Sequence, residues 1–201
     1  MADPIVEIKD LKLSLVGGAG PVNILRGIDL QVAAGETVSI VGPSGAGKTS
    51  LLMVLSGLEK ADSGAIQVSG VDLLQLDEDE LARFRRQHVG IVFQSFHLVP
   101  TMTALENVAL PLEFAGVDDA MEQAAAALQA TGLATRQAHF QGQLSGVEQQ
   151  REKVMELLFG LQREFGTTLL LVTHDDKLAA RCGRTLQMTD GYLQSLTGEV
   201  A

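Results

Sequence analysis

The chain has 201 residues, of which 46% are hydrophobic and 20% charged, a composition that suits a soluble globular body with a sizeable core. Its net charge of −10 argues against nucleic-acid binding, which needs a basic surface. The longest apolar runs are too short to cross a bilayer, and Met1–Pro4 lacks the basic start of an export signal. A single cysteine, Cys182, excludes an internal disulfide, and we therefore expect a cytoplasmic location.

The first 36 residues have the pattern of β-structure. Residues 5–16 alternate loosely between apolar and polar and predict a pair of strands. Residues 17–21 predict a turn, and residues 24–32 predict a further strand that ends before Gly35.

The most informative stretch is residues 42–49, which fit the phosphate-binding pattern G-x-x-x-x-G-K-[ST]. The apolar, β-branched residues 37–41 predict a buried strand before it, and residues 50–58 predict a helix after it. We expect the backbone and side chains of this loop to hold phosphates: Gly42, Pro43, Ser44, Gly45, Ala46, Gly47, Lys48, Thr49 and Ser50. Lys48 can reach the β- and γ-phosphates, and the Thr49 hydroxyl can ligate Mg²⁺. The alternative is a glycine-rich turn without a ligand, which is rarer in this strand–loop–helix context.

Residues 63–94 predict a strand, a helix and a strand in turn. Residues 63–70 lie between turns, and Asp77 is a plausible N-cap for a helix to Gln87. The basic cluster at 83–86 follows the acidic residues 77–80, which favours a solvated helix of mixed charge over a nucleic-acid site. Residues 89–94 then predict a short apolar strand that ends at Gln94.

Helices are predicted from residue 95 to residue 162. Thr103 and Glu106 have the spacing of a capping box, and alanine-rich residues 118–130 predict a helix. A second capping box, Ser145 with Glu148, predicts the start of a helix that continues to Gln162.

The last 35 residues return to β-structure. Residues 167–174 predict a buried strand that ends at His174, residues 178–182 a short helix, and residues 186–196 a hairpin around Asp190 and Gly191. Three apolar strands therefore end in polar groups, at Gly42, Gln94 and His174. Because ligands bind beyond the carboxyl ends of parallel strands, we expect these ends to meet at one crevice. Taken alone, His174 would more often be a surface or capping histidine, and Gln94 an ordinary loop residue.

With these residues in place, the chain resembles the nucleotide-binding subunit of ATP-binding cassette (ABC) transporters, nearest to the lipoprotein-release and macrolide-export group with its YbbA-type relatives. The matching segments are residues 42–50, 93–100, 103–111, 143–151 and 166–175. The resemblance implies an α/β fold: a P-loop NTPase core with a parallel sheet, an N-terminal antiparallel β subdomain and an inserted helical subdomain. It implies one ABC ATPase domain over residues 1–201, with the core in 1–94 and 152–201 and the helical subdomain in 95–151.

The resemblance also implies roles for single residues. Lys48, Gln94 and His174 would be catalytic: Gln94 would contact Mg²⁺ together with Thr49, and His174 would contact the γ-phosphate of ATP. The signature residues Ser145, Gly146, Val147 and Glu148 would close over the ATP of a partner subunit. The implied cofactors are ATP and Mg²⁺. The implied partners are a second nucleotide-binding subunit, in a homodimer or other sandwich dimer, and a membrane permease of the FtsX/MacB-like type, with the chain peripheral on the inner face of the membrane.

Three departures from the family pattern stand out. Val147 replaces a glycine of the signature, and its β-branched side chain would restrict close approach to a phosphate. No aromatic residue precedes Phe84, so a residue such as Val16 would have to pack against the base in place of a ring.

The third departure is the largest: about 30 residues are missing between Arg151 and Glu152, including an apolar strand and the acidic side chains that support Mg²⁺ and polarise water. Neither Glu152 nor Glu156 is assigned those roles, because both belong to a predicted solvated helix face. The strand at 169–172 would be left without a neighbour. The segment is either truly deleted or was dropped from the sequence. An intact mass near 21.3 kDa would establish the deletion, since the segment would add roughly 3 kDa.

Three functions follow from these observations. The first is an ATPase subunit that couples ATP binding and hydrolysis to a membrane permease. The second is a regulatory subunit that binds nucleotide with little or no hydrolysis, because the acidic strand end is absent. The third, a chromosome-maintenance ATPase, is disfavoured by the acidic charge and by the lack of heptads between the loop and the signature.

Overall fold

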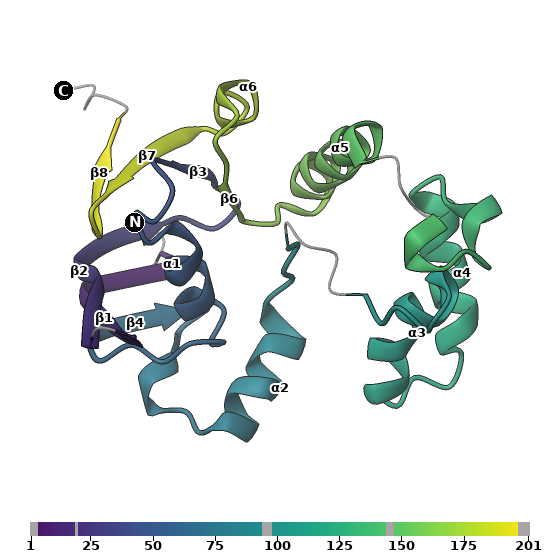
Figure 1. Ribbon diagram of the computed structural model, residues 1–201, viewed down its shortest axis with the longest axis horizontal. Helices are drawn as coiled ribbons and strands as arrows, with labels where there is room; N and C mark the ends of the chain where they lie inside the picture. Colours follow the sequence, from purple (N-terminus) through teal and green to yellow (C-terminus); the bar gives the residue numbers. More distant parts are fainter. Residues whose placement is uncertain (1–3, 19, 94–97, 144–146, 197–201) are drawn as a thin grey trace. The chain divides into compact units, whose positions relative to one another are not determined.

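The structure is a computed structural model that describes residues 4–18, 20–93, 98–143 and 147–196, with the backbone alone described for 147–153. Two compact units divide the chain: residues 1–91 with 162–201 form unit 1, and residues 92–161 form unit 2. Each unit is described by itself below, and Figure 1 labels the α-helices and all strands except β5.

An antiparallel sheet forms the first part of unit 1. It contains β1 (Val6–Gly17), β2 (Gly20–Val32), β4 (Ser63–Val68) and β5 (Val71–Asp72), in the order β2-β1-β4-β5. Figure 1 labels β1, β2 and β4 of this sheet. The prediction of two strands in residues 5–16 was wrong, because β1 is one strand with a bulge. Asp10 has φ of 44° at this bulge, and the buried positions change parity there, from Val6 and Ile8 to Leu11 and Leu13.

A second sheet of unit 1 carries the phosphate-loop pattern. Its strands are β3 (Thr37–Val41), β6 (Leu169–Val172), β7 (Arg184–Thr189) and β8 (Tyr192–Ser195), in the order β6-β3-β7-β8. β3 runs parallel to both β6 and β7, whereas β7 and β8 form the predicted antiparallel hairpin. The sheet therefore presents the carboxyl ends of β3 and β6 at the same edge.

The core of unit 1 lies between these sheets and helix α1 (Lys48–Leu55). Leu51 and Val54 of α1 are buried in the same apolar cluster as Val38 and Ile40 of β3. Leu11 and Leu25 of the antiparallel sheet belong to the same cluster. One apolar face of each sheet is therefore buried together with α1, and this packing holds the loop before α1 in place.

Further helices of unit 1 begin at well-defined caps. η1 (Leu73–Gln75) is capped by Asp72, and α2 (Glu78–His88) has the predicted N-cap Asp77 in a full capping box with Glu80. α6 (Asp176–Ala179) starts earlier than the predicted helix at 178–182, because the Asp175 side chain accepts from the first amides of the helix.

The prediction of a strand at residues 89–94 was wrong for residues 89–93, which form no strand. Gln94 lies outside the described residues. Ile91, Val92 and Phe93 are instead exposed. An apolar run becomes a strand only where a neighbouring strand accepts its hydrogen bonds, and the described sheets offer none to this run.

Unit 2 is helical. α3 (Ala104–Phe114) packs against α4 (Ala120–Ala130) through small side chains, and Ala109 and Ala124 are fully buried. The predicted capping box of Thr103 with Glu106 starts α3. η2 (Ala134–Arg136), η3 (Gln141–Gln143) and α5 (Val147–Phe165) follow. α5 extends beyond the predicted end at Gln162, and its residues 162–165 belong to unit 1. In the described part of the chain no helix is long and apolar enough to cross a membrane.

Candidate functional site

The loop at residues 42–47 is held in a shape that only glycine permits at its two ends. Gly42 has φ of 143°, and a Cβ built there would lie 2.0 Å from the carbonyl oxygen of Met188. Gly47 has φ of 102°, and its Cβ would lie 2.9 Å from the carbonyl oxygen of Ile24. The backbone of β7 therefore contacts the loop at Gly42, and the backbone of β2 contacts it at Gly47. These two contacts explain why the phosphate-binding pattern has glycine at both positions.

Helix α1 has no side-chain cap at its N-terminus, in contrast to α2 and α3. Its N-cap is Gly47, which has no side chain to accept from the first amides. Asp77 and Thr103, by contrast, close α2 and α3 with capping boxes. The free amides and the helix dipole at Lys48 and Thr49 therefore favour an anion at this end of α1.

The Lys48 ammonium group lies over the loop that precedes it. Its Nζ donates to the carbonyl oxygens of Gly42 and Pro43, at 2.8 and 2.7 Å. Thr49 is exposed at the second position of α1. The loop thus places one cation and one hydroxyl at the open helix end, the donor set that a triphosphate with Mg²⁺ requires.

The β7–β8 hairpin turn supports the loop from behind, a contact that the sequence did not indicate. The Gly191 amide donates to the Ala46 carbonyl at 3.1 Å, and the Arg26 amide donates to the Gly191 carbonyl at 2.9 Å. Asp190 and Gly191 both have positive φ, as the predicted two-residue turn requires. The Asp-Gly pair was the signal for the turn, but the turn's contact with Ala46 joins residues far apart in the sequence.

His174 lies at the carboxyl end of β6, next to the end of β3. The Thr173 amide donates to the Ile40 carbonyl at 3.3 Å, and Ile40 precedes Gly42 by two residues. Thr173 is buried and its hydroxyl accepts from the Asp175 amide, whereas His174 between them is exposed. The structure therefore brings two of the three predicted strand ends together.

The structure does not describe how the other predicted site residues lie relative to this edge. Gln94, Ser145 and Gly146 lie outside the described residues, and Val147 and Glu148 form the first turn of α5, without described side chains. Glu156 is exposed on α5. Across the described residues no group of three or more His, Cys, Asp or Glu side chains could hold a metal ion.

Strand β6 forms one edge of its sheet. It pairs with β3 alone among the described strands, and its residues are half-buried rather than fully buried. This is the state expected for the strand at 169–172 when a neighbouring strand is missing.

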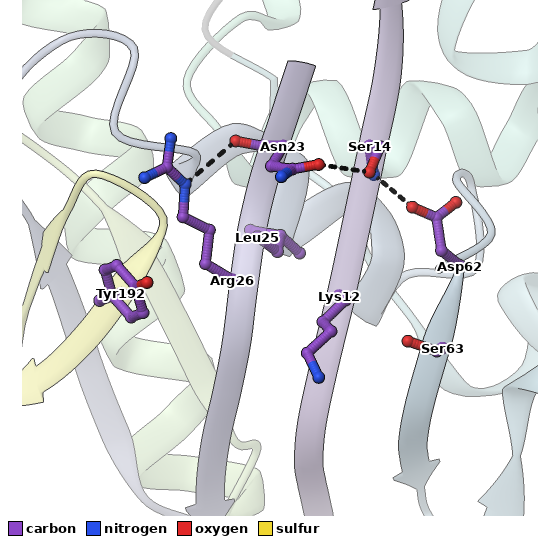
Figure 2. A pocket seen from close by; sticks show the side chains of 8 residues that line it. All are labelled: Lys12, Ser14, Asn23, Leu25, Arg26, Asp62, Ser63 and Tyr192. Carbon is purple, nitrogen blue, oxygen red and sulfur yellow. Dashed lines mark hydrogen bonds between the residues drawn. The ribbon is translucent and has the colours of Figure 1, made fainter. Parts of the chain in front are cut away.

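A concavity of about 580 Å³ lies on the antiparallel sheet and contains none of the predicted site residues. Figure 2 shows Arg26 and Tyr192 on one side of it and Asp62 and Ser63 on the other. Its polar groups are largely paired with one another, since Ser14 bonds to both Asn23 and Asp62. Val16, considered above as a base contact, lies opposite Pro21 and is 90% exposed.

Comparison with known proteins agrees with this geometry. Residues 25–163 match the ABC transporter family. The chain is 43% identical to the uncharacterized ABC transporter ATP-binding protein YbbA of Escherichia coli K12, over 96% of this chain and 98% of that protein. It is 36% identical to the lipoprotein-releasing system ATP-binding protein LolD of Novosphingobium aromaticivorans, covering 96% of this chain and 100% of LolD.

A solved structure has the same fold. The ATP-binding cassette MJ0796, solved as a dimer in a post-hydrolysis state with ADP and phosphate, matches with a TM-score of 0.86 and 31% identity. The match covers 96% of this chain and 99% of that one. It confirms the predicted P-loop NTPase fold.

The alignment with YbbA also bears on the missing segment. It is 223 positions long but takes in 96% of a chain of 201 residues, so roughly 30 positions of YbbA have no counterpart here. The macrolide export ATP-binding/permease protein MacB of Shigella flexneri is 38% identical over 94% of this chain, which spans 34% of MacB. The chain therefore belongs to the ABC transporter family, in the group of ATP-binding components that includes YbbA, LolD and MacB.

Proposed function

We propose that this chain binds Mg-ATP at residues 42–50 and serves a membrane permease of the FtsX/MacB-like type from the inner face of the membrane. The observation that carries this proposal is the open N-terminus of α1, with a glycine cap and with Lys48 lying over the loop. The relatives support the permease: LolD belongs to a lipoprotein-releasing system, and MacB contains both ATP-binding and permease parts.

In this proposal the amides and side chains of the loop, together with Gln94 and His174, each contact a different part of Mg-ATP. The amides from Gly45 to Ser50 bind the β- and γ-phosphates, and Lys48 exchanges its carbonyl acceptors for phosphate oxygens. The Thr49 hydroxyl and Gln94 would hold Mg²⁺, which would supply positive charge against the phosphates. His174, exposed beside the end of β3, contacts the γ-phosphate.

The second half of the proposal is a dimer. The signature residues 145–148 at the start of α5 would meet the ATP of a second subunit, because a helix N-terminus attracts phosphate. Unit 1 would then be the nucleotide-binding core and unit 2 the helical subdomain of one cassette. The dimeric state of MJ0796 supports this arrangement.

Hydrolysis is the step at which this chain should differ from its relatives. The described residues contain no group of three or more His, Cys, Asp or Glu side chains that could hold a metal ion, and roughly 30 positions of YbbA have no counterpart here. If the segment is truly absent, we infer very slow turnover. A regulatory subunit that binds ATP without hydrolysis is therefore the second candidate. Intact mass tests the premise, since a value near 21.3 kDa means that no segment was dropped from the sequence.

Equilibrium titration with Mg-ATP tests binding, and phosphate release with the permease present tests turnover. We expect saturable binding that Lys48→Ala weakens at least tenfold. Lys9→Ala, which removes an exposed ion pair with Glu7, is the matched control and should bind like the parent chain. Absence of saturation would contradict the proposal, and binding without phosphate release would favour the regulatory candidate.

A further inference from the structure

The concavity on the antiparallel sheet is built from two adjacent rows of side chains on the exposed face of the sheet. In the first row, Lys12 of β1 lies opposite Arg26 of β2 on one side and opposite Ser63 of β4 on the other. In the second row, Ser14 of β1 lies opposite Asn23 of β2. Three neighbouring strands therefore form the floor of this concavity of about 580 Å³ (Figure 2).

The guanidinium group of Arg26 carries a charge that no carboxylate of the described residues balances. Its Nε donates to the Asn23 carbonyl oxygen at 3.4 Å, and its two terminal nitrogens have no hydrogen-bond partner in the described ranges. Lys12, directly opposite Arg26, bonds to Asp10 at 2.8 Å. Like charges opposite each other on neighbouring strands are unfavourable. A carboxylate held by the free fork of Arg26 would offset this repulsion.

The opposite wall of the concavity carries a negative charge. The Asp62 carboxylate accepts from the Ser14 amide through Oδ2 at 2.6 Å, while its Oδ1 has no partner within the described part of the chain. Figure 2 shows Asp62 and Ser63 across the concavity from Arg26 and Tyr192. The concavity is therefore polarised, with a cation at one wall and a carboxylate at the other.

We propose that this concavity binds a zwitterionic peptide of two or three residues, with its carboxylate on Arg26 and its ammonium group on Asp62. The two walls stand at β2 and β4, which are two strand spacings apart, or about 10 Å. An extended peptide of three residues spans about 10 Å, whereas the two charges of a single amino acid lie too close together to contact both walls. The half-exposed ring of Tyr192 offers an apolar face to a peptide side chain.

The charges of the walls disfavour other classes of ligand. A simple oxyanion would be attracted by Arg26 and repelled by Asp62, whereas a dipolar ligand is attracted at both ends. A nucleic acid or an anionic membrane would be repelled by the net charge of −10. The concavity contains none of residues 42–50, so peptide binding there does not depend on the proposed binding of Mg-ATP.

Tyr192 makes a site-specific test possible, because it is the single tyrosine of a chain without tryptophan. Its fluorescence reports directly on the concavity. The experiment titrates trialanine at low ionic strength, without nucleotide, so that screening does not weaken the charge pairs. We expect a saturable change in the parent chain and in Lys48→Ala. Arg83→Gln, which removes an exposed arginine of α2 outside the concavity, is the matched control and should bind trialanine like the parent chain.

Changes to the peptide should match changes to the chain. Trialanine amide lacks the carboxylate and N-acetyltrialanine lacks the ammonium group, so each should bind about fivefold more weakly than trialanine. Arg26→Gln should weaken trialanine to the same extent but leave the affinity for trialanine amide unchanged, because the contact is already lost. Asp62→Asn keeps an oxygen for the Ser14 amide, and it should show the corresponding selectivity with N-acetyltrialanine. Circular dichroism checks that each variant is folded.

A parent chain whose tyrosine fluorescence shows no saturable change with trialanine would overturn the proposal. Equal affinities for trialanine and its amide would do so without any variant, since the carboxylate would then make no contact. Sodium acetate or inorganic phosphate that binds as tightly as trialanine would assign the concavity to a simple anion and not to a peptide.

Discussion

The carbonyl oxygen of Met188 lies 2.0 Å from the point that a Cβ on Gly42 would occupy, although the two residues are 146 positions apart. This contact ties the start of the phosphate loop to strand β7. It also explains why Gly42 is required for packing as well as for its backbone conformation.

Gly42→Ala should therefore lower the free energy of unfolding more than Gly45→Ala, because only a Cβ at Gly42 would clash with another part of the backbone. Gly45 has φ of 80° but no atom within 4 Å of its would-be Cβ, so Gly45→Ala should cost only the backbone strain of about 1–2 kcal/mol. Gly42→Ala must in addition displace Met188, and we expect a loss of about 3 kcal/mol or more. Urea unfolding of both variants measures the difference, and equal losses would contradict the contact.

The turn behind the loop allows a similar comparison. A Cβ on Gly191 would lie 2.5 Å from the Ile24 carbonyl oxygen, whereas one on Gly132 would meet nothing within 4 Å, and both glycines have positive φ. Gly191→Ala should lower both stability and Mg-ATP affinity, because the Gly191 amide bonds to Ala46. Gly132→Ala should lower stability by about 1–2 kcal/mol and leave affinity unchanged.

The capping box of α3 should make that helix sensitive to acid. Hydrogen bonds from the Thr103 backbone and side chain lower the pKa of Glu106 below its usual value of 4.5. Because the folded pKa is the lower one, the stabilisation is complete above pH 4.5 and is lost as the pH falls through the folded pKa. Glu106→Gln should remove this dependence, which hydrogen exchange of α3 amides can follow between pH 3 and pH 6. An unchanged pH profile would contradict the assignment.

Cys182 should react slowly with alkylating reagents. Burial raises the pKa of its thiol above the usual value of 9.0, although contacts with Ser39 and Arg181 oppose this shift in part. The reactive thiolate is therefore scarce at neutral pH. We expect iodoacetamide to modify the native chain more slowly than the urea-unfolded chain, and equal rates would show that the thiol is not protected.

Agreement between sequence and structure is closest where the chemistry is local. Capping boxes at Asp77 and Thr103, the turn at Asp190 and the strand–loop–helix around Lys48 each depend on residues within a few positions of one another. The roles of Gln94, Ser145 and His174 stay predictions, since only His174 among them is described by the structure.

The failed predictions share one physical cause. Residues 89–93 are as apolar as residues 169–172, yet only the latter form a strand, because β3 offers them main-chain partners. The bulge at Asp10 likewise follows from pairing between β1 and its neighbours, which no alternation pattern in residues 5–16 reveals.

The sequence by itself determined the family, the phosphate loop and the capped starts of α2 and α3, because these depend on residue type at fixed short spacing. Tertiary structure alone decided which backbone groups obtain partners: Gly191 with Ala46, Thr173 with Ile40, and none among the described residues for the outer edge of β6. Hydrogen bonds between distant strands are set by the arrangement of the whole chain, and a sheet edge is a property of that arrangement rather than of any segment.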